Sequence, residues 1–248
     1  MSITSTGKNL SILICSDYKF VFNWMSFAAW YSIKRNLPHS EIAVTCARDF
    51  SNVQLYNWAY RSGVKFFLHK NVNKQLPYLN KIYGVYIALK EELIKPPFLV
   101  IDADMMAVRN LSNYCLDILN KSVFATNKNG TVWYFNNNCL EKIVDTINKI
   151  SESDLSNNNL DLINLNEVFG KPDIIDDLGN EAHESDMATF AHYKKRCGNF
   201  FRNEYEKGLV HPPFREQSAL RTVDMTVTEK KVFDLWLQMW TTFEVLSK

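Results

Sequence analysis

The chain has 248 residues, of which 46% are hydrophobic, and a formal net charge of +1. This size and apolar content are sufficient for a full hydrophobic core in one globular domain. Because the chain is nearly neutral, its overall charge does not predict binding to nucleic acid or to a membrane, and any such contact must be local. Residues 1–8 lack the apolar segment of a secretory signal, and no apolar run is long enough to span a bilayer. We therefore expect a cytoplasmic protein that does not bind a membrane.

The cysteines agree with this expectation. There are five, they are scattered along the chain, and none forms a Cys-x-x-Cys motif. An odd and dispersed set is typical of reduced thiols in a cytoplasm rather than of a disulfide framework or a metal site.

The first hundred residues alternate between strand and helix patterns. Strands are predicted over 10–15, 41–46 and 64–68, and helices over 20–35, 51–60 and 75–93. In the last of these helices the apolar residues recur at the spacing of one buried face, and Pro96-Pro97 ends the segment. Alternation of this length predicts parallel strands joined by right-handed crossovers, which gives a doubly wound sheet.

The next strand carries the most informative motif. The apolar run from Phe98 to Val108 contains Asp102-Ala103-Asp104. Carboxylates at the end of a buried parallel strand lie where open α/β sheets bind their ligands. If the segment is extended, both carboxylates project to the same side and can face one ion. Two hard oxygen donors suit Mg²⁺ or Mn²⁺ holding a nucleotide diphosphate.

Asp-x-Asp at a strand end is compatible with other roles. Aspartates at a strand end also serve as helix caps or turn residues. A phosphatase-type Asp-x-Asp is disfavoured because Met105-Met106 stands where a hydroxyl residue is expected. The chain also lacks a Walker-type phosphate loop.

Asp102-Ala103-Asp104 resembles the DxD motif of GT-A glycosyltransferases. The resemblance implies a single α/β domain over 1–248 with a doubly wound, mostly parallel sheet and a small antiparallel portion after the motif. Residues 10–126 would form the nucleotide-binding half and 127–248 the acceptor half. Asp102 and Asp104 would bind Mn²⁺ or Mg²⁺, with Asp102 also contacting the UDP-sugar donor, and a hexose, most often glucose, would be transferred to a hydroxyl acceptor. A sugar-1-phosphate nucleotidyltransferase shares this sheet but is disfavoured, since no glycine follows the first strand.

The pattern changes after the motif. Short strands are predicted over 122–126 and 131–135 around an Asn-Gly turn, followed by a helix over 140–150. Asn136 resembles the start of a family stretch beside the donor sugar, which implies a donor contact. The strongly acidic segment 151–186 is interpreted as a solvated insertion or lid. The closing amphipathic helix over 228–246 would place its tryptophans in the core or at a subunit interface, and the second placement predicts a homo-oligomer through this helix.

The resemblance also implies donor-binding residues before the motif. Ser16 and Asp17 follow the first strand, where this fold usually holds the uracil and ribose. Lys81 stands on the helix before the motif, where the family often keeps a cation facing the diphosphate. Each of these residues, taken alone, could equally be an ordinary surface residue.

Catalytic residues are implied in the second half. Glu216-Gln217 resembles the acid–amide pair that opens a helix beside the anomeric carbon, and Asp186 resembles an acceptor-binding acid. Glu216 could instead be an acid favoured by a helix N-terminus. His211 or Asp224 could provide the third metal ligand, or the diphosphate and water could complete the shell. The family places its histidine ligand later in the chain, which leaves the stereochemical outcome open. A structural loop residue is the alternative for His211.

The acceptor is the least determined part. The segment from Tyr193 to Arg202 interleaves basic and aromatic residues, a combination that can bind phosphates and stack on bases. The same pattern also fits a solvated helix whose aromatic residues point inward. Together with the chain length, it resembles the T-even phage enzymes that add glucose to hydroxymethylcytosine or to glucose already on it, which implies double-stranded modified DNA as the acceptor. A saccharide acceptor of bacterial surface polysaccharide and a non-catalytic nucleic-acid-binding protein are the alternatives.

Overall fold

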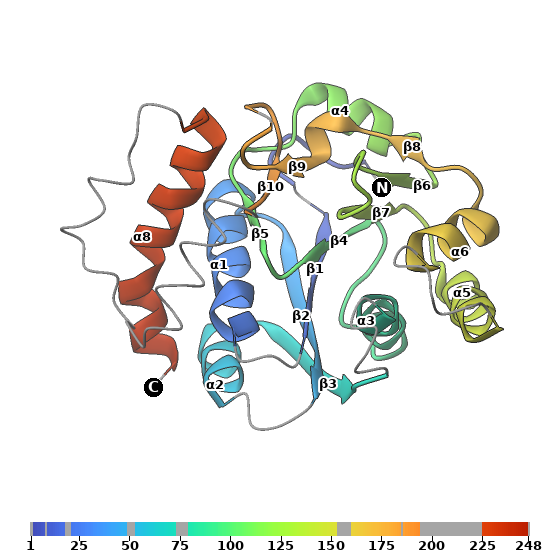
Figure 1. The fold of residues 1–248 in the computed structure, drawn as a ribbon, viewed down its shortest axis with the longest axis horizontal. Coiled ribbons are helices and arrows are strands. Elements are labelled where there is room, and N and C mark those ends of the chain that lie inside the picture. The colour runs from blue at the N-terminus through green and yellow to red at the C-terminus, as the bar shows by residue number, and fades with distance from the viewer. Residues whose placement is uncertain are drawn as a thin grey trace.

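The computed structural model describes residues 2–7, 9–17, 21–48, 53–72, 79–152, 160–184, 186–193 and 225–247. These residues form a seven-stranded sheet in the order β3-β2-β1-β4-β7-β6-β8 and a three-stranded sheet in the order β5-β10-β9. Helices cover both faces of the larger sheet (Figure 1). The architecture is α/β with a mostly parallel central sheet, as the sequence predicted.

The parallel half follows the predicted alternation. Its strands are β1 (Ser11–Ser16), β2 (Glu41–Arg48), β3 (Lys65–Lys70) and β4 (Phe98–Asp102). The connecting helices are α1 (Val21–Asn36), α2 (Val53–Ser62) and α3 (Leu79–Lys90). The chain moves outward from β1 to β3 and then returns to place β4 on the other side of β1. The order of strands therefore reverses between β1 and β4, and a crevice at such a switch point is where α/β sheets bind ligands.

Two apolar layers hold this sheet between helices. Along β1 successive side chains point to opposite faces, so Ile12 and Ile14 belong to one core cluster and Leu13 to the other. The first cluster packs beneath α1, α2 and the C-terminal helix, and the second beneath α3 and α5 (Leu140–Glu152). Burial on both faces explains why these strands are continuously apolar rather than alternating.

The antiparallel portion after the motif is also confirmed. Strand β7 (Trp133–Phe135) pairs antiparallel with β4 and with β6 (Phe124–Thr126), and β6 pairs parallel with β8 (Asp173–Ile174). Helix α4 (Asn113–Leu119) precedes this hairpin, and α6 (Leu160–Phe169) packs beside α5 further along the chain (Figure 1).

The acidic segment differs from its prediction as a solvated insertion or lid. Its described residues include β8, a 3₁₀ turn η1 (Asp176–Leu178) and β9 (Gly179–Glu181), which pairs with β10 (Phe190–His192). Ile175 and Leu178 are fully buried in the main core. The acidic residues are spaced between apolar ones that face inward, so a high charge content did not exclude a core role for this segment.

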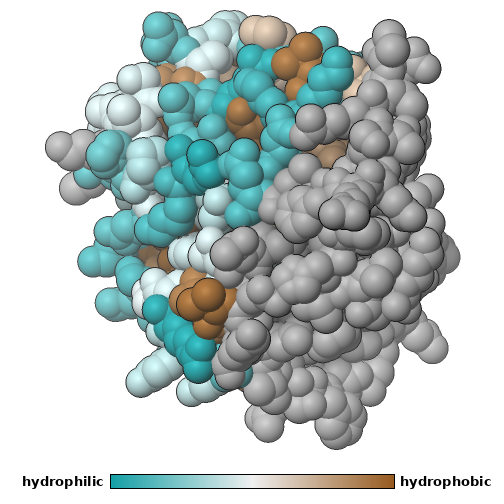
Figure 2. All heavy atoms as spheres, turned by 90° about the vertical axis from the view of Figure 1, so that its left-hand side faces the viewer, coloured by the Kyte–Doolittle hydropathy of each residue, from teal (hydrophilic) through white to brown (hydrophobic). Residues whose placement is uncertain are grey.

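The C-terminal helix α8 (Val227–Ser247) lies beside α1 and α2 (Figure 1). The rings of Phe243 and Phe27 are 5.0 Å apart, and Trp236 is buried, which places this tryptophan in the core. On the face of the molecule that carries α8, the described hydrophobic residues stand in small separate groups among hydrophilic ones (Figure 2). Oligomer formation through α8 stays a prediction. No helix among the described residues has the length and apolar content needed to cross a bilayer.

Candidate metal centre

Three side chains converge at the switch point between β1 and β4. Asp102 ends β4, Asp104 follows two residues later, and His192 ends β10. Their potential ligand atoms all lie within 4.8 Å of one another. The imidazole is almost fully buried, whereas both carboxylates are about 30% accessible to solvent. A buried base behind two accessible carboxylates forms a site that can be reached from one side.

The backbone brings the two aspartates together in a way that the sequence did not predict. Residues 103 and 104 form a turn, and the chain then reverses into β5 (Met105–Ala107), so the segment is not continuously extended. Tyr193 holds this turn, because its amide donates to the carbonyl oxygen of Asp104 at 3.3 Å and its hydroxyl donates to that of Ala103 at 3.5 Å. The carboxylates therefore converge because the chain bends between them.

Strand pairing places His192 at the motif. In the antiparallel register of β5 and β10, His192 pairs with Met105, the residue after Asp104. Its Nε2 lies 3.0 Å from Oδ2 of Asp104, and its Nδ1 lies 3.2 Å from Oε1 of Glu181. Burial alone would lower the pKa of His192, but the carboxylates of Asp104, Glu181 and Asp102 outweigh it and raise the pKa to about 9. Without a metal, His192 is therefore protonated at neutral pH.

Lys81 lies behind Asp102 on α3. Its ammonium group is 2.9 Å from Oδ1 of Asp102 and donates to the carbonyl oxygen of Thr131 at 2.8 Å. It also lies 4.0 Å from the ring centroid of Trp133, and the side chain is only 9% exposed. Lys81 thus lies beside the end of β4, and its charge is paired with Asp102.

The hairpin turn next to Lys81 is organised by Asn127, which no sequence motif marks as a site residue. The buried Asn127 amide donates to Thr131 Oγ1 at 2.9 Å and to the carbonyl oxygen of Gly179 at 2.8 Å. Its Oδ1 accepts from the amides of Thr131 and Val132, each at 2.9 Å. One asparagine therefore fixes the turn that contacts Lys81 and ties it to β9.

The acidic segment contributes Asp161, a second carboxylate near Lys81. Asp161 is in the first turn of α6, and its Oδ1 accepts from the Leu162 amide at 2.8 Å. Burial raises the pKa of Asp161, while its proximity to Lys81 opposes this rise and Asp102 adds to it. In the sequence Asp161 is one of many acidic residues, and nothing local distinguishes it from the others.

Ser16 and Asp17 lie at the same edge of the sheet as Asp102. Ser16 ends β1, and its neighbour Cys15 pairs with Asp102 across the switch point. Ser26 on α1 donates to the Ser16 hydroxyl at 2.7 Å. The Asp17 carboxylate accepts from the buried Asn80 amide at 3.2 Å. These two residues are therefore positioned beside the candidate centre.

Two predicted site residues lie elsewhere. Asn136 follows β7, and because β7 runs antiparallel to β4, Phe135 pairs with Phe98 at the start of β4. Asn136 is therefore at the edge of the sheet opposite Asp102, and the position predicted for it is wrong.

Asp186 is the second residue that is displaced. It precedes β10, and its backbone oxygen accepts a hydrogen bond from the Arg109 side chain. Arg109 follows the end of β5 that is farther from Asp104. Its carboxylate accepts from the amides of Val227 and Thr228 at 2.8 and 3.4 Å, which caps the first turn of α8. The structure therefore shows Asp186 capping α8, and its acceptor contact stays a prediction.

Glu216, Gln217, His211 and Asp224 lie outside the described residues, as do 194–202 of the basic and aromatic stretch.

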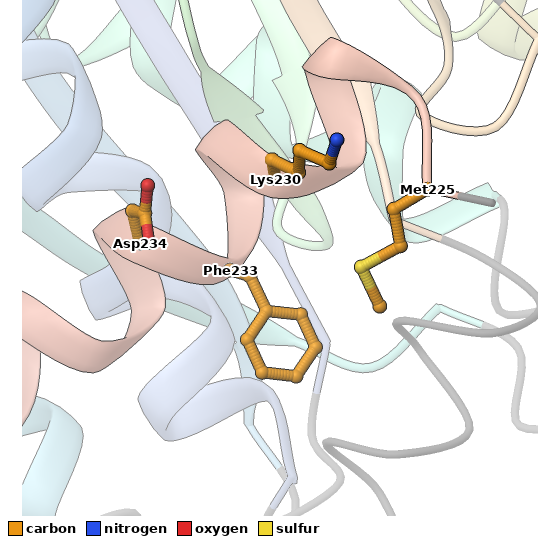
Figure 3. A pocket seen from close by; sticks show the side chains of 4 residues that line it. All are labelled: Met225, Lys230, Phe233 and Asp234. Carbon is orange, nitrogen blue, oxygen red and sulfur yellow. The ribbon is translucent and has the colours of Figure 1, made fainter. Parts of the chain in front are cut away.

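A pocket near the start of α8 is separate from the candidate centre. Met225 and Phe233 extend into the same space, while Lys230 and Asp234 point away (Figure 3). None of these four residues belongs to the group around Asp102.

The donor set fits a divalent cation. Two carboxylates and one imidazole suit Mn²⁺ and related ions, with remaining coordination positions available for phosphate oxygens and water. Lys81 binds Oδ1 of Asp102, so this carboxylate would bind the ion through its other oxygen alone. The negative charge of the same carboxylates, which raises the pKa of His192, also favours a bound cation.

The sequence matches no protein-family model and no curated protein. Among solved structures, apo glycosyltransferase GlyE of Streptococcus pneumoniae TIGR4 matches with a TM-score of 0.60 at 12% identity, over 95% of this chain and 62% of that chain. A second GlyE structure gives 0.55 at 13% identity, with the same coverage. A complex of the galactosyltransferase LgtC with donor and acceptor sugar analogs gives 0.49 at 13% identity, over 84% of this chain and 99% of that chain. The chain spans less than two thirds of GlyE, and this likeness identifies its fold as that of GT-A glycosyltransferases.

Proposed function

We propose that this protein is a metal-dependent glycosyltransferase that takes a hexose from a UDP-sugar, with glucose as the first candidate, and transfers it to a hydroxyl acceptor. The observation that carries the proposal is the convergence of Asp102, Asp104 and His192 at the switch point of a GT-A-like sheet. Ligands of open α/β sheets bind at this position, and the donor set suits a cation that holds a diphosphate.

The surrounding residues would divide the work. Asp102, Asp104 and His192 would hold Mn²⁺ or Mg²⁺, which when bound neutralises charge on the leaving diphosphate. Lys81 keeps Asp102 in one orientation through its ion pair and its contact with Thr131. Ser16 and Asp17, at the adjoining strand end, would contact the nucleoside of the donor.

The reacting centre would lie on the open side of the carboxylates. Asp161 is a candidate for orienting the sugar, because it lies close enough to Lys81 and Asp102 for their charges to act on its carboxylate. Glu216-Gln217 stays the proposed pair beside the anomeric carbon on the resemblance of its sequence alone. A positioned carboxylate can orient the acceptor hydroxyl or stabilise positive charge that develops on the sugar.

A DNA acceptor is supported only by the basic and aromatic sequence of residues 194–202, since Tyr193, the first residue of that stretch, is buried against the turn at residues 103 and 104. A saccharide acceptor requires no such stretch. The two are separated by offering both acceptors in one assay.

The test is UDP release from a set of UDP-sugars with Mn²⁺ or with excess chelator. Acceptors would be saccharides, unmodified duplex DNA and duplex DNA carrying glucosylated hydroxymethylcytosine. We expect metal-dependent release that increases with one acceptor class. Nucleotide-sugar binding without any metal-dependent turnover, across all donors and acceptors, would support a non-catalytic protein that keeps the fold.

A further inference from the structure

Glu181 is a largely, though not fully, buried carboxylate behind the candidate metal centre. It ends β9 and lies directly across from His192 in the parallel register of β9 and β10. Its Oε1 is 3.2 Å from Nδ1 of His192, and its side chain is 14% exposed. The opposite ring nitrogen, Nε2, is the one that faces Asp104.

We propose that Glu181 is a positioning residue that fixes His192 as a metal ligand through Nε2. An imidazole can bind a cation through only one nitrogen while the other carries a proton. A carboxylate at Nδ1 accepts that proton in a hydrogen bond, so Nε2 is left with its lone pair directed at the ion. The same hydrogen bond prevents rotation of the ring and increases the basicity of the liganding nitrogen.

The strand pairing makes this arrangement rigid. Glu181 and His192 are at paired positions on neighbouring strands, and the carbonyl oxygen of His192 accepts from the amide of Ala182 at 2.9 Å. Gly179, at the start of β9, is tied to the hairpin turn by Asn127. The carboxylate is therefore carried on a backbone that is connected to both β10 and the turn next to Lys81.

Glu181 can have this role only if the proposed metal centre exists, so the inference rests on the proposed function. It adds a residue that does not touch the ion and whose effect must pass through His192. Removing such a partner of a metal-bound histidine typically weakens metal affinity about 10- to 100-fold.

The test is calorimetric titration of Mn²⁺ into the purified chain, without donor or acceptor. Glu181→Ala is expected to weaken Mn²⁺ binding about 10- to 100-fold, and Glu181→Gln less, because its amide oxygen can still accept from Nδ1. Glu184→Ala is the matched control. Glu184 is three residues away and is 3.4 Å from a different imidazole, that of His183. Its loss should leave Mn²⁺ affinity unchanged.

A double-mutant cycle separates positioning from direct ligation. In a His192→Ala background, Glu181→Ala should have almost no further effect on Mn²⁺ affinity, since the ring it orients is gone. An equal loss in both backgrounds would show that Glu181 acts independently of His192 and would overturn the proposal. Unchanged affinity of folded Glu181→Ala would also overturn it.

Nitrogen NMR of ¹⁵N-histidine-labelled wild-type protein gives a readout that does not depend on how the variants fold. With diamagnetic Zn²⁺ as the probe, the His192 signals, assigned through His192→Asn, should show Nδ1 protonated and Nε2 bound to metal. The reverse pattern would contradict the role of Glu181. A wild-type chain that binds neither Mn²⁺ nor Zn²⁺ would instead contradict the proposed function itself.

Discussion

The ammonium group of Lys81 lies 2.9 Å from Oδ1 of Asp102, in a contact that is closed off by Trp133 and by the carbonyl oxygen of Thr131. The positive charge of Lys81 therefore acts on the candidate metal centre through the carboxylate of Asp102. On the other side of the centre, His192 is held between Asp104 and Glu181. Two of the three candidate ligands are thus oriented by a charged neighbour that comes from another element of the fold.

Lys81→Met is expected to lower the free energy of unfolding by about 2–3 kcal/mol, because it leaves Asp102 without its cation and removes a cation–π contact. The exposed pair of Lys149 and Glu167 is the matched control, with the same 2.9 Å separation. Lys149→Met should change stability by less than about 0.5 kcal/mol. Urea unfolding measures both variants, and equal losses would show that burial of the Lys81 pair has no energetic consequence.

Asp186→Ala should destabilise the protein by about 1 kcal/mol through loss of the cap on α8. Its turnover per folded molecule should remain that of the wild type, because Asp186 is at the far end of the β5–β10 pair from Asp104. Thr226→Ala, which removes another side chain from the same helix start, should give a similar thermal shift. A large fall in kcat for Asp186→Ala, without loss of stability, would restore the acceptor-binding role predicted from the sequence.

Metal affinity should depend on pH through His192. The pKa of about 9 is above the ordinary value of 6.5, so the metal-free site holds a proton at neutral pH that a metal must displace. The protonated form stabilises the metal-free fold below about pH 6.5, and this stabilisation is lost as pH rises through 9. Apparent Mn²⁺ affinity should accordingly rise up to about tenfold per pH unit between these values.

Calorimetry at several pH values tests this dependence in wild type and in His192→Asn. The variant should bind Mn²⁺ more weakly and with little pH dependence in that range. His183→Asn is the control for a neighbouring imidazole outside the centre. A wild-type affinity that stays flat from pH 6.5 to 9 would contradict proton displacement at His192.

Local patterns were sufficient to predict the parallel half of the fold. Apolar strands such as β1, and the single buried face of α3, reflect burial that is decided by nearby residues. The same reasoning located Asp102 at a strand end. It did not predict that residues 103 and 104 turn, because a run of apolar residues after Asp104 is equally consistent with one longer strand.

The rest of the site depends on contacts between distant parts of the chain. His192 ends a three-residue strand, and only its pairing with β5 brings it to Asp104. In the sequence, the only sign of this strand is a short apolar run that ends in a histidine, and such a run does not show which strand it pairs with. Asn136 was misplaced for the same reason, because the direction of β7 relative to β4 decides which end of the hairpin faces the site.

The central claim, that Asp102, Asp104 and His192 form a cation site for a nucleotide diphosphate, is tested most directly by calorimetric titration of UDP with and without Mn²⁺. We predict that Mn²⁺ raises the UDP affinity of the wild type by at least about tenfold, equivalent to 1.4 kcal/mol, and leaves that of Asp104→Asn unchanged. The same UDP affinity with and without Mn²⁺ in the wild type, or an undiminished gain in folded Asp104→Asn, would contradict the claim.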